Sequence, residues 1–326
     1  MVLFMHRRVS LAITAATAAL VLTGCSTGTT TPASVSSGSV RSGKTTTPSA
    51  TPTPTPTPTP TLDTSGVDRA LAALETEYDA TVGVVATDTV TGESVTHNGD
   101  RRFGYASTVK ALAAAQFLRS VRGSDRDEVV HWTTADVAAA GHSPVTEQHV
   151  ADGLSYAALA EAAVRQSDNT ALNLVLTRIG GPSGLDAALH DLGDEVTQVV
   201  YDEPDLNTIE PGSTEDTTTP AAFAADLATV LDGTTLNTAD RAQLLDWMGG
   251  NATGDTLIRA GAPEGWTVAD KSGGAGGIRN DVALVTRPGG DPIVIAVLTT
   301  RNDPGAVYDD ALVAKTASVV LGAFAR

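Results

Sequence analysis

Ser107 and Lys110 are the first residues whose types and spacing suggest chemistry. They lie three positions apart at the start of an Ala-rich segment, so a helix there would put the serine hydroxyl and the lysine amine on one face. A serine hydroxyl is a weak nucleophile unless a neighbour accepts its proton, and a helix N-terminus offers N–H groups to a developing oxyanion. The alternative interpretation is a capping serine and a solvated lysine.

Three consecutive polar residues, Ser167-Asp168-Asn169, separate two segments with helical periodicity. Any of them could cap the following helix. The Ser167 hydroxyl could also pass a proton to a leaving group, and the Asn169 amide could bind a substrate carbonyl. The triplet alone does not distinguish a cap from a site.

Glu203 and Asn207 lie four positions apart in a polar, Pro-rich stretch that continues to Pro220. On one short turn they could hold a water molecule together, with Glu203 accepting its proton and Asn207 fixing its position. The alternative is a solvated acidic loop, which the composition of this stretch also favours.

Lys271-Ser272-Gly273-Gly274 ends a predicted strand that begins near Thr267. Glycines weaken a strand and often mark a close approach of a ligand, so Gly273 and Gly274 suggest an edge that pairs with substrate. The alternative is a turn, and Gly276-Gly277 indicates that a turn does follow. Arg279 opens the next predicted strand, where its guanidinium could bind a carboxylate.

The elements that must position these residues lie between residues 63 and 326, where no second linker occurs. Helices are predicted at Val67–Tyr78, Ser107–Ser120, Tyr156–Gln166, Asn169–Ile179, Gly184–Leu192, Pro220–Leu231, Thr238–Met248 and Val307–Phe324. Strands are predicted at Thr81–Thr87, Ser94–His97, Thr267–Lys271, Val282–Thr286 and Ile293–Thr300. This order predicts an α+β fold: the N- and C-terminal parts form one antiparallel sheet, and an all-helical lobe is inserted. Such folds place active sites in the cleft between lobes.

Residues 1–24 have the pattern of an export signal. Arg7 and Arg8 precede an apolar stretch, Val9–Leu22, that is too short to span a bilayer. The stretch ends in Leu22-Thr23-Gly24-Cys25, which resembles the bacterial lipobox, and Cys25 is the only cysteine of the chain. This resemblance implies cleavage before Cys25, lipidation of its thiol and anchoring outside the cytoplasmic membrane. The alternative is an ordinary signal with an incidental cysteine.

Residues 25–62 have the composition of a linker rich in Ser, Thr, Gly and Pro, with an alternating Thr-Pro run across residues 51–61. Proline at every second position removes N–H donors and fixes φ, so we expect a semi-rigid extended spacer rather than helix or sheet. The spacer would hold residues 63–326 away from the membrane. A recognition ligand for another protein is the weaker alternative.

Charge and composition exclude several classes of function. The chain has 21 Lys and Arg against 38 Asp and Glu, a net charge of −17, and the few charged residues before Asp63 are all basic. The remainder is therefore strongly acidic, which argues against nucleic-acid binding and leaves the N-terminal lipid as the expected membrane contact. One cysteine excludes an internal disulfide, and the six histidines show no clustered ligand spacing. We expect no metal and no cofactor, and a tethered monomer.

Taken in order, the Ser-x-x-Lys, Ser-Asp-Asn, Glu-x-x-x-Asn and Lys-Ser-Gly groups resemble the motifs of the class A β-lactamases. The resemblance covers essentially all of residues 63–326. Further similar segments are Ser143–Glu147, Asp216–Pro220, Trp247-Met248, Thr253-Gly254, Ile258–Gly261 and Arg279–Ala283. The resemblance implies the three-layer fold of the serine β-lactamases and penicillin-binding proteins. It also implies hydrolysis of the β-lactam amide through a serine acyl-enzyme, and thus antibiotic resistance.

The resemblance further implies a role for each motif residue. Ser107 would attack the lactam carbonyl, with the backbone N–H groups of Ser107 and Gly274 as oxyanion donors. Glu203 with Asn207 would orient and deprotonate the water that releases the acyl group. Lys110 would take or relay the serine proton, although whether Lys or Glu is the acylation base is disputed within the family.

Contacts with the rest of the substrate are implied in the same way. Ser167 would pass a proton to the lactam nitrogen, with Lys271 lowering the cost of that transfer. Asn169 would hold the acylamide side chain, and Ser272 with Arg279 would bind the substrate carboxylate.

The loop that carries Glu203 departs from the family pattern. Many members have an Arg two positions before the general-base Glu, paired with an Asp near the far end of the loop. Here that place is Tyr201, while Asp216 remains and Glu215 precedes it. The usual ion pair is therefore expected to be absent, which predicts slower deacylation unless something replaces it, because a misplacement near 1 Å can cost on the order of 10²-fold in rate.

Two other positions also depart from the family pattern. The turn between Lys271 and Arg279 is about one residue short, which leaves the register of Arg279 open. His142 falls where the family often has an aromatic residue at the mouth of the cleft, and the alternative is a solvated loop residue.

Two other functions remain open at this point. A low-molecular-weight penicillin-binding protein or DD-peptidase shares the Ser-x-x-Lys, Ser-x-Asn and Lys-x-Gly groups but needs no Glu203–Asn207 pair, so this pair discriminates. A non-catalytic cell-wall or β-lactam-binding lipoprotein would keep the fold after losing turnover. The absent ion pair at Tyr201 is its only support in the sequence.

Overall fold

The computed structural model describes Leu62 and residues 64–325. The predicted export signal, Cys25 and all but the end of the predicted linker lie outside these described residues. Among the residues described, no helix is both long enough and apolar enough to cross a membrane.

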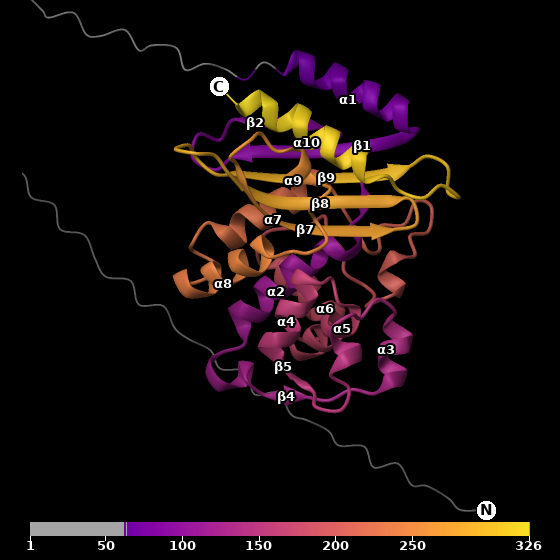
Figure 1. Ribbon diagram of the computed structural model, residues 1–326, viewed down its shortest axis with the longest axis vertical. Coiled ribbons are helices and arrows are strands. Elements are labelled where there is room, and N and C mark those ends of the chain that lie inside the picture. The colour runs from indigo at the N-terminus through magenta and orange to yellow at the C-terminus, as the bar shows by residue number, and fades with distance from the viewer. Residues whose placement is uncertain (1–61, 63, 326) are drawn as a thin grey trace, which may run out of the picture. The chain divides into compact units, whose positions relative to one another are not determined.

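A five-stranded antiparallel sheet forms the centre of the fold, with the strand order β2-β1-β9-β8-β7 (Figure 1). The strands are β1 Ala80–Asp88, β2 Ser94–His97, β7 Thr267–Ala275, β8 Ile278–Thr286 and β9 Ile293–Arg301. The N-terminal β1 pairs along its whole length with the C-terminal β9, from Ala80 opposite Arg301 to Asp88 opposite Ile293. Chain segments more than 200 residues apart therefore share one sheet, as the strand patterns at both ends predict.

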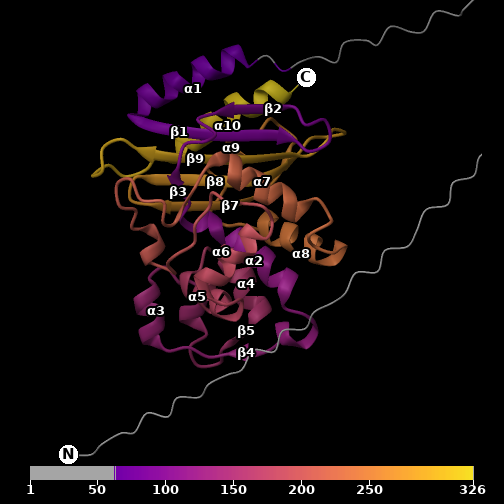
Figure 2. The same cartoon turned by 180° about the vertical axis from the view of Figure 1, so that it is seen from behind.

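Helices cover both faces of this sheet, as the views from the front and from behind show (Figures 1 and 2). The first and last helices, α1 Ser65–Tyr78 and α10 Asp310–Phe324, lie on one face together with the short α9 Ile258–Gly261. The other face packs against the inserted helical part of the chain. This part consists of α2 Val109–Ser120, α3 Thr134–Ala140, α4 Tyr156–Arg165, α5 Asn169–Arg178, α6 Gly181–His190, α7 Pro220–Leu231 and α8 Thr238–Gly249.

The central strands bury both of their faces, which explains why they are apolar at nearly every position. Ile293, Ile295 and Val297 of β9 pack into the core beneath α1 and α10. The alternating Val294, Ala296 and Leu298 pack into the core with the inserted helices. Because successive side chains of a strand point to opposite faces, one strand contributes to two separate cores.

Short elements complete the fold. β3 Phe103–Gly104 pairs with β6 Thr217–Thr218, and β4 Val129–Val130 pairs with β5 Leu154–Ser155. Single turns of 3₁₀ helix occur at η1 Ala106–Thr108, η2 Gly123–Arg126, η3 Thr146–Gln148 and η4 Asp205–Asn207. The β3–β6 pair is important for the site, because it joins the segment before Ser107 to the segment after Glu203.

The predicted fold class is confirmed, and several predicted boundaries are wrong. The strand expected to end near Lys271 continues to Ala275, because its pairing with β8 persists through Gly273 opposite Asn280 and Gly274 opposite Arg279. The last helix begins at Asp310 rather than Val307, where the Asp309 side chain accepts a hydrogen bond from Ala311 N and caps it. The helix at Thr134–Ala140 was not predicted, although the capping box of Thr133 and Asp136 marks its start.

Candidate active site

Ser107 lies in the 3₁₀ turn between β3 and α2, and Lys110 is in the first turn of α2. The Lys110 Nζ atom donates a hydrogen bond of 2.8 Å to Ser107 Oγ. The lysine side chain is completely buried, whereas Ser107 remains partly accessible. The spacing of three residues therefore gives the predicted contact, and Ser107 is not the capping residue that the alternative interpretation required.

Polar partners surround the Lys110 ammonium group. Its Nζ atom lies 2.9 Å from Glu203 Oε1 and donates hydrogen bonds to Asn169 Oδ1 at 2.6 Å and to the Ser167 carbonyl oxygen at 2.8 Å. Burial lowers the pKa of Lys110 below its usual value, and the adjacent Glu203 carboxylate opposes that shift. An amine whose proton is easier to remove is suited to exchanging protons with Ser107.

The Glu203 carboxylate connects Ser107 to Asn207. Its Oε1 atom accepts a hydrogen bond of 3.1 Å from Ser107 Oγ, and its Oε2 atom accepts one of 2.7 Å from Asn207 Nδ2. The turn η4 brings Asn207 back to Glu203, as their spacing of four residues predicts. The pair is thus not a solvated acidic loop, because Glu203 is buried.

Asn173, which lies outside the motifs recognised in the sequence, fixes the backbone at Glu203. Its side-chain amide donates to the Glu203 carbonyl oxygen at 2.8 Å, and its Oδ1 atom accepts from Glu203 N at 2.9 Å. Asn173 is one helical turn after Asn169 on α5, so the i, i+4 spacing of two asparagines was a usable signal.

Ser167 lies between the two buried lysines. Its Oγ atom accepts a hydrogen bond of 3.1 Å from Lys271 Nζ and one of 3.4 Å from Lys110 Nζ. The neighbouring Asp168 is the residue that caps α5, by accepting from Ala171 N. The triplet therefore contains both a cap and two residues that line the cleft.

Lys271 belongs to β7, the outermost strand at one edge of the sheet. Burial, and then the charge of Lys110, lower its pKa to about 7. Two residues further along, Gly273 lies against the nucleophile: a Cβ atom placed on it would be 3.1 Å from Ser107 N. The strand edge at Gly273 and Gly274 thus runs beside Ser107, and Gly274 is exposed at that edge.

Arg279 points into the same cavity, so the shortened turn does not remove it from the site. It lies opposite Gly274 in the β7–β8 pairing. Its Nε atom donates a hydrogen bond of 2.7 Å to Asp310 Oδ1, and its guanidinium lies over the Tyr308 ring, 4.8 Å from the centroid. Asp310 and Tyr308 were not predicted, because their contacts with Arg279 depend on how α10 approaches the sheet.

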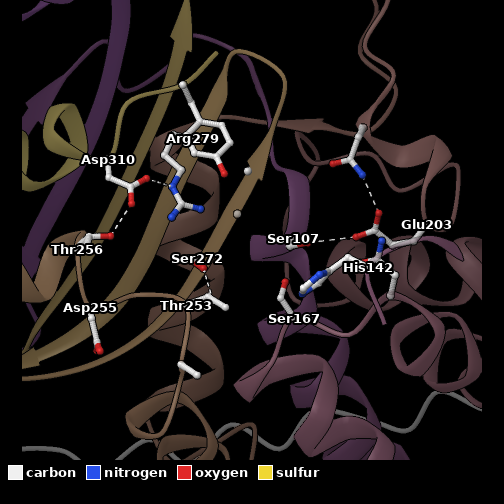
Figure 3. A pocket seen from close by; sticks show the side chains of 16 residues that line it. Ser107, His142, Ser167, Glu203, Thr253, Asp255, Thr256, Ser272, Arg279 and Asp310 are labelled. Atoms are coloured by element: carbon white, nitrogen blue, oxygen red, sulfur yellow. Dashed lines mark hydrogen bonds and ion pairs between the residues drawn. The ribbon is translucent and has the colours of Figure 1, made fainter. Parts of the chain in front are cut away.

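A cavity of about 470 Å³ joins these groups between the sheet edge and the helical part. Figure 3 shows Arg279, Asp310 and Ser272 on one side of it and Ser107, Glu203 and His142 on the other. Thr253, on the loop after α8, hydrogen-bonds to Ser272 with an oxygen–oxygen distance of 2.6 Å. His142 lines the cavity from an exposed loop and lies 3.2 Å from the Gln166 carbonyl oxygen through Nε2.

The arrangement is suited to acyl transfer. A partly accessible hydroxyl contacts a buried amine and a buried carboxylate, which is the nucleophile-with-base geometry of covalent catalysis. A second hydroxyl beside Lys271 is available for proton transfer, and Arg279 supplies a cation for an anionic part of a ligand. Within the described residues, no group of three or more His, Cys, Asp or Glu side chains could hold a metal ion.

The model of the β-lactamase enzyme family matches residues 66–324. The chain is 48% identical over 258 residues to a β-lactamase of Amycolatopsis lactamdurans, covering 79% of this chain and 85% of that protein. It is 46% identical over 255 residues to a β-lactamase of Bacillus subtilis (strain 168), covering 78% of this chain and 83% of that protein.

Solved structures are similar over the same region. The class A β-lactamase of Clostridium kluyveri has a TM-score of 0.77 at 44% identity, covering 80% of this chain and 99% of that one. The β-lactamase of Streptomyces albus G also has a TM-score of 0.77, at 37% identity, covering 79% and 99%. The matching sequence, the shared fold and the site geometry lead to one conclusion: the chain belongs to the class A serine β-lactamase family.

Proposed function

We propose that this β-lactamase hydrolyses the β-lactam amide bond through an acyl-enzyme on Ser107. The Ser107 hydroxyl attacks the lactam carbonyl, and Lys110, whose Nζ atom lies 2.8 Å from Ser107 Oγ, takes or relays the serine proton. The backbone N–H groups of Ser107 and Gly274 receive the developing oxyanion, which is supported by the close packing of the β7 edge against Ser107.

The lactam nitrogen must gain a proton as its bond to the carbonyl carbon breaks. Ser167 supplies it, because its hydroxyl contacts both Lys110 and Lys271 and can be reprotonated from either amine. Asn169 holds the acylamide side chain of the substrate, and Ser272 with Arg279 binds the substrate carboxylate.

Release of the acyl group requires an activated water. Glu203 deprotonates this water and Asn207 orients it, since the two side chains are already joined by a 2.7 Å hydrogen bond. The resulting hydroxide attacks the ester carbonyl, Ser107 recovers its proton, and the product leaves as the ring-opened acid. The Glu203–Asn207 pair carries the proposal, because a penicillin-binding protein has no need of it.

The test follows a chromogenic cephalosporin by absorbance and intact mass on one sample of residues 63–326. We expect many turnovers from the unmodified protein, no adduct with Ser107→Ala, and an accumulating acyl-enzyme with Glu203→Gln. Normal turnover by Glu203→Gln would remove Glu203 from the mechanism. A stable one-to-one adduct on the unmodified protein would favour a penicillin-binding function, and neither adduct nor turnover in a folded sample would favour a non-catalytic protein.

We also propose that the chain acts outside the cytoplasm as a lipoprotein anchored to the cell membrane through Cys25. The support is the lipobox-like sequence at the only cysteine, followed by the Thr-Pro spacer. Full-length protein is expected in the membrane fraction, and Cys25→Ser is expected to release it into the medium or periplasm. Equal membrane association of both forms would contradict the anchor.

A further inference from the structure

Asp216 closes the loop that carries Glu203, and it does so without a cationic partner. Its Oδ1 atom accepts hydrogen bonds from Val200 N at 3.0 Å, from Tyr201 N at 3.2 Å and from the Tyr105 hydroxyl at 2.5 Å. Among the described residues, no Lys, Arg or His forms an ion pair with Asp216, and the Tyr201 side chain is 44% exposed. The side-chain partner of Asp216 is therefore a phenol rather than the cation of the family pattern.

Tyr105 joins the nucleophile segment to this loop. It lies two residues before Ser107, and its backbone N–H donates to the Asp216 carbonyl oxygen at 3.4 Å. Directly beside this contact, Gly104 pairs with Thr217 in the β3–β6 ladder. Tyr105 is completely buried and Asp216 is 1% exposed, so no water competes for the phenol–carboxylate bond.

The Tyr105 hydroxyl can only act as the donor in this contact. Burial, and then the negative charge of Asp216, raise the pKa of Tyr105 well above its usual value. The phenol consequently keeps its proton throughout the neutral and mildly alkaline range. A donor bound to a carboxylate gives a charge-assisted hydrogen bond, which is roughly twice as strong as a neutral one.

We infer that the Tyr105 hydroxyl is a positioning group for deacylation, because it anchors Asp216 and so holds Glu203 at its working distance from Ser107. This inference rests on the proposed function, in which Glu203 activates the water. Only Asp202 lies between Glu203 and Tyr201, whose N–H is bound to Asp216. Asn173 holds the Glu203 peptide independently, so loss of the phenol should loosen the loop without detaching it.

The test is Tyr105→Phe, which removes one oxygen and leaves the ring in the core. We expect deacylation to slow about tenfold, while acylation of Ser107 changes less than about twofold, because small displacements of a catalytic group cost rate steeply. Deacylation then limits turnover, so kcat and KM fall together and kcat/KM is preserved. Stopped-flow kinetics and intact mass spectrometry measure the two steps and the accumulated acyl-enzyme.

Tyr156→Phe is the matched control, since the same atom is removed from a tyrosine of α4 whose ring packs near Phe117 and Arg178, away from the cavity. It should leave both rates unchanged. A rescue variant adds Tyr201→Arg to Tyr105→Phe, offering a guanidinium to Asp216, whose Oδ2 atom has no hydrogen-bond partner among the described residues. Recovery of deacylation by this variant is expected, and a purely structural defect in the core would not be rescued.

A double variant separates this inference from the proposed function. If Tyr105 acts through Glu203, Tyr105→Phe adds no further slowing to Glu203→Gln. The inference is overturned if Tyr105→Phe lowers kcat/KM as much as kcat, or if it slows deacylation tenfold in the Glu203→Gln background as well. Normal turnover by Glu203→Gln alone would instead overturn the proposed role of Glu203.

Discussion

At the scale of single residues, the site combines groups whose charges depend on their neighbours. Two lysines, Lys110 and Lys271, are both completely buried and both contact Ser167. The Lys110 ammonium group makes Lys271 harder to protonate, and Glu203 partly compensates for the effect of burial on both lysines. The protonation state of this cluster is therefore expected to determine how activity varies with pH.

Lys271 is expected to set the alkaline limit of activity. Burial and the charge of Lys110 lower its pKa to about 7, so the ammonium is present below that pH and is lost as the pH rises through it. The neutral amine no longer attracts a substrate carboxylate or assists proton transfer from Ser167. We expect kcat/KM to fall above about pH 7. Lys271→Arg, which stays charged, should move this limit upward by more than about one pH unit. If Lys271→Arg leaves the alkaline limb of the pH–rate profile where it is, a group other than Lys271 causes the fall in kcat/KM.

Asp310 is expected to weaken the binding of carboxylate-bearing substrates. It neutralises Arg279 from within the cavity, at 2.7 Å from its Nε atom. Asp310→Asn retains an acceptor for Nε–H but removes the charge. We expect KM to fall about twofold to fivefold with kcat little changed, which corresponds to a partly exposed ion pair of about 0.5–1 kcal/mol.

The control for this prediction is Asp255→Asn. It removes the same charge from the same cavity, where Asp255 pairs with Arg259 rather than Arg279. A fall in KM of equal size in both variants would mean that the general charge of the cavity, rather than the Arg279 contact, governs affinity.

At the scale of elements, the packing of α7 depends on a buried carboxyl group. Asp226 of α7 is 3% exposed, and it faces Asp194 in the loop after α6. Burial, the hydrogen bond with Asp194 and the charge of Asp194 raise the pKa of Asp226 to about 9. Asp226 is thus protonated at neutral pH and donates to Asp194, whose own Oδ1 atom accepts from Val196 N and Thr197 N.

This pair predicts a stability that declines as the pH rises. Between the ordinary aspartate pKa of 3.8 and about 9, folded Asp226 holds a proton that the unfolded chain has released, so folding takes up a proton and is disfavoured by alkali. Asp226→Asn keeps a donor and cannot titrate. Its free energy of unfolding, from urea melts between pH 5 and 8.5, should decline less steeply than that of the unmodified protein.

Glu195→Gln is the control for the urea denaturation experiments, because Glu195 is exposed and lines the same surface hollow as Asp194 and Asp226. It should reproduce the pH dependence of the unmodified protein. If the free energy of unfolding varies with pH equally in Asp226→Asn and in the unmodified protein, Asp226 is ionised in the folded state.

At the scale of the whole molecule, the sheet explains which contacts could be predicted from the sequence. Ser107 with Lys110, and Glu203 with Asn207, are contacts within one turn, so their spacing predicts them. The contact between Ser107 and Glu203 joins residues 96 positions apart. It was expected only from the family resemblance, since no local pattern encodes it.

Other features could not be predicted because their cause is tertiary. The extension of β7 to Ala275 comes from its ladder with β8, which overrides the weak strand preference of Gly273 and Gly274. The partners of Arg279 come from the approach of α10 to the sheet. Among the described residues Asp216 forms no ion pair, and Tyr201 stands where the family pattern has its cationic partner. Nothing in the sequence near Tyr201 indicated that Tyr105 would contact Asp216.

The sequence by itself determined the order of the principal helices and strands and the motif residues, because periodicity and short spacing are local properties. The division of the chain at the Thr-Pro linker stays a prediction from composition. Only the tertiary structure decided which groups meet: Glu203 with Ser107, Ser167 between two lysines, Asp310 with Arg279 and Tyr105 with Asp216. These contacts depend on the pairing of β1 with β9, which joins the two ends of the described chain into one sheet. Contacts of such long range are fixed by the packing of the whole core, and no segment of the sequence specifies them alone.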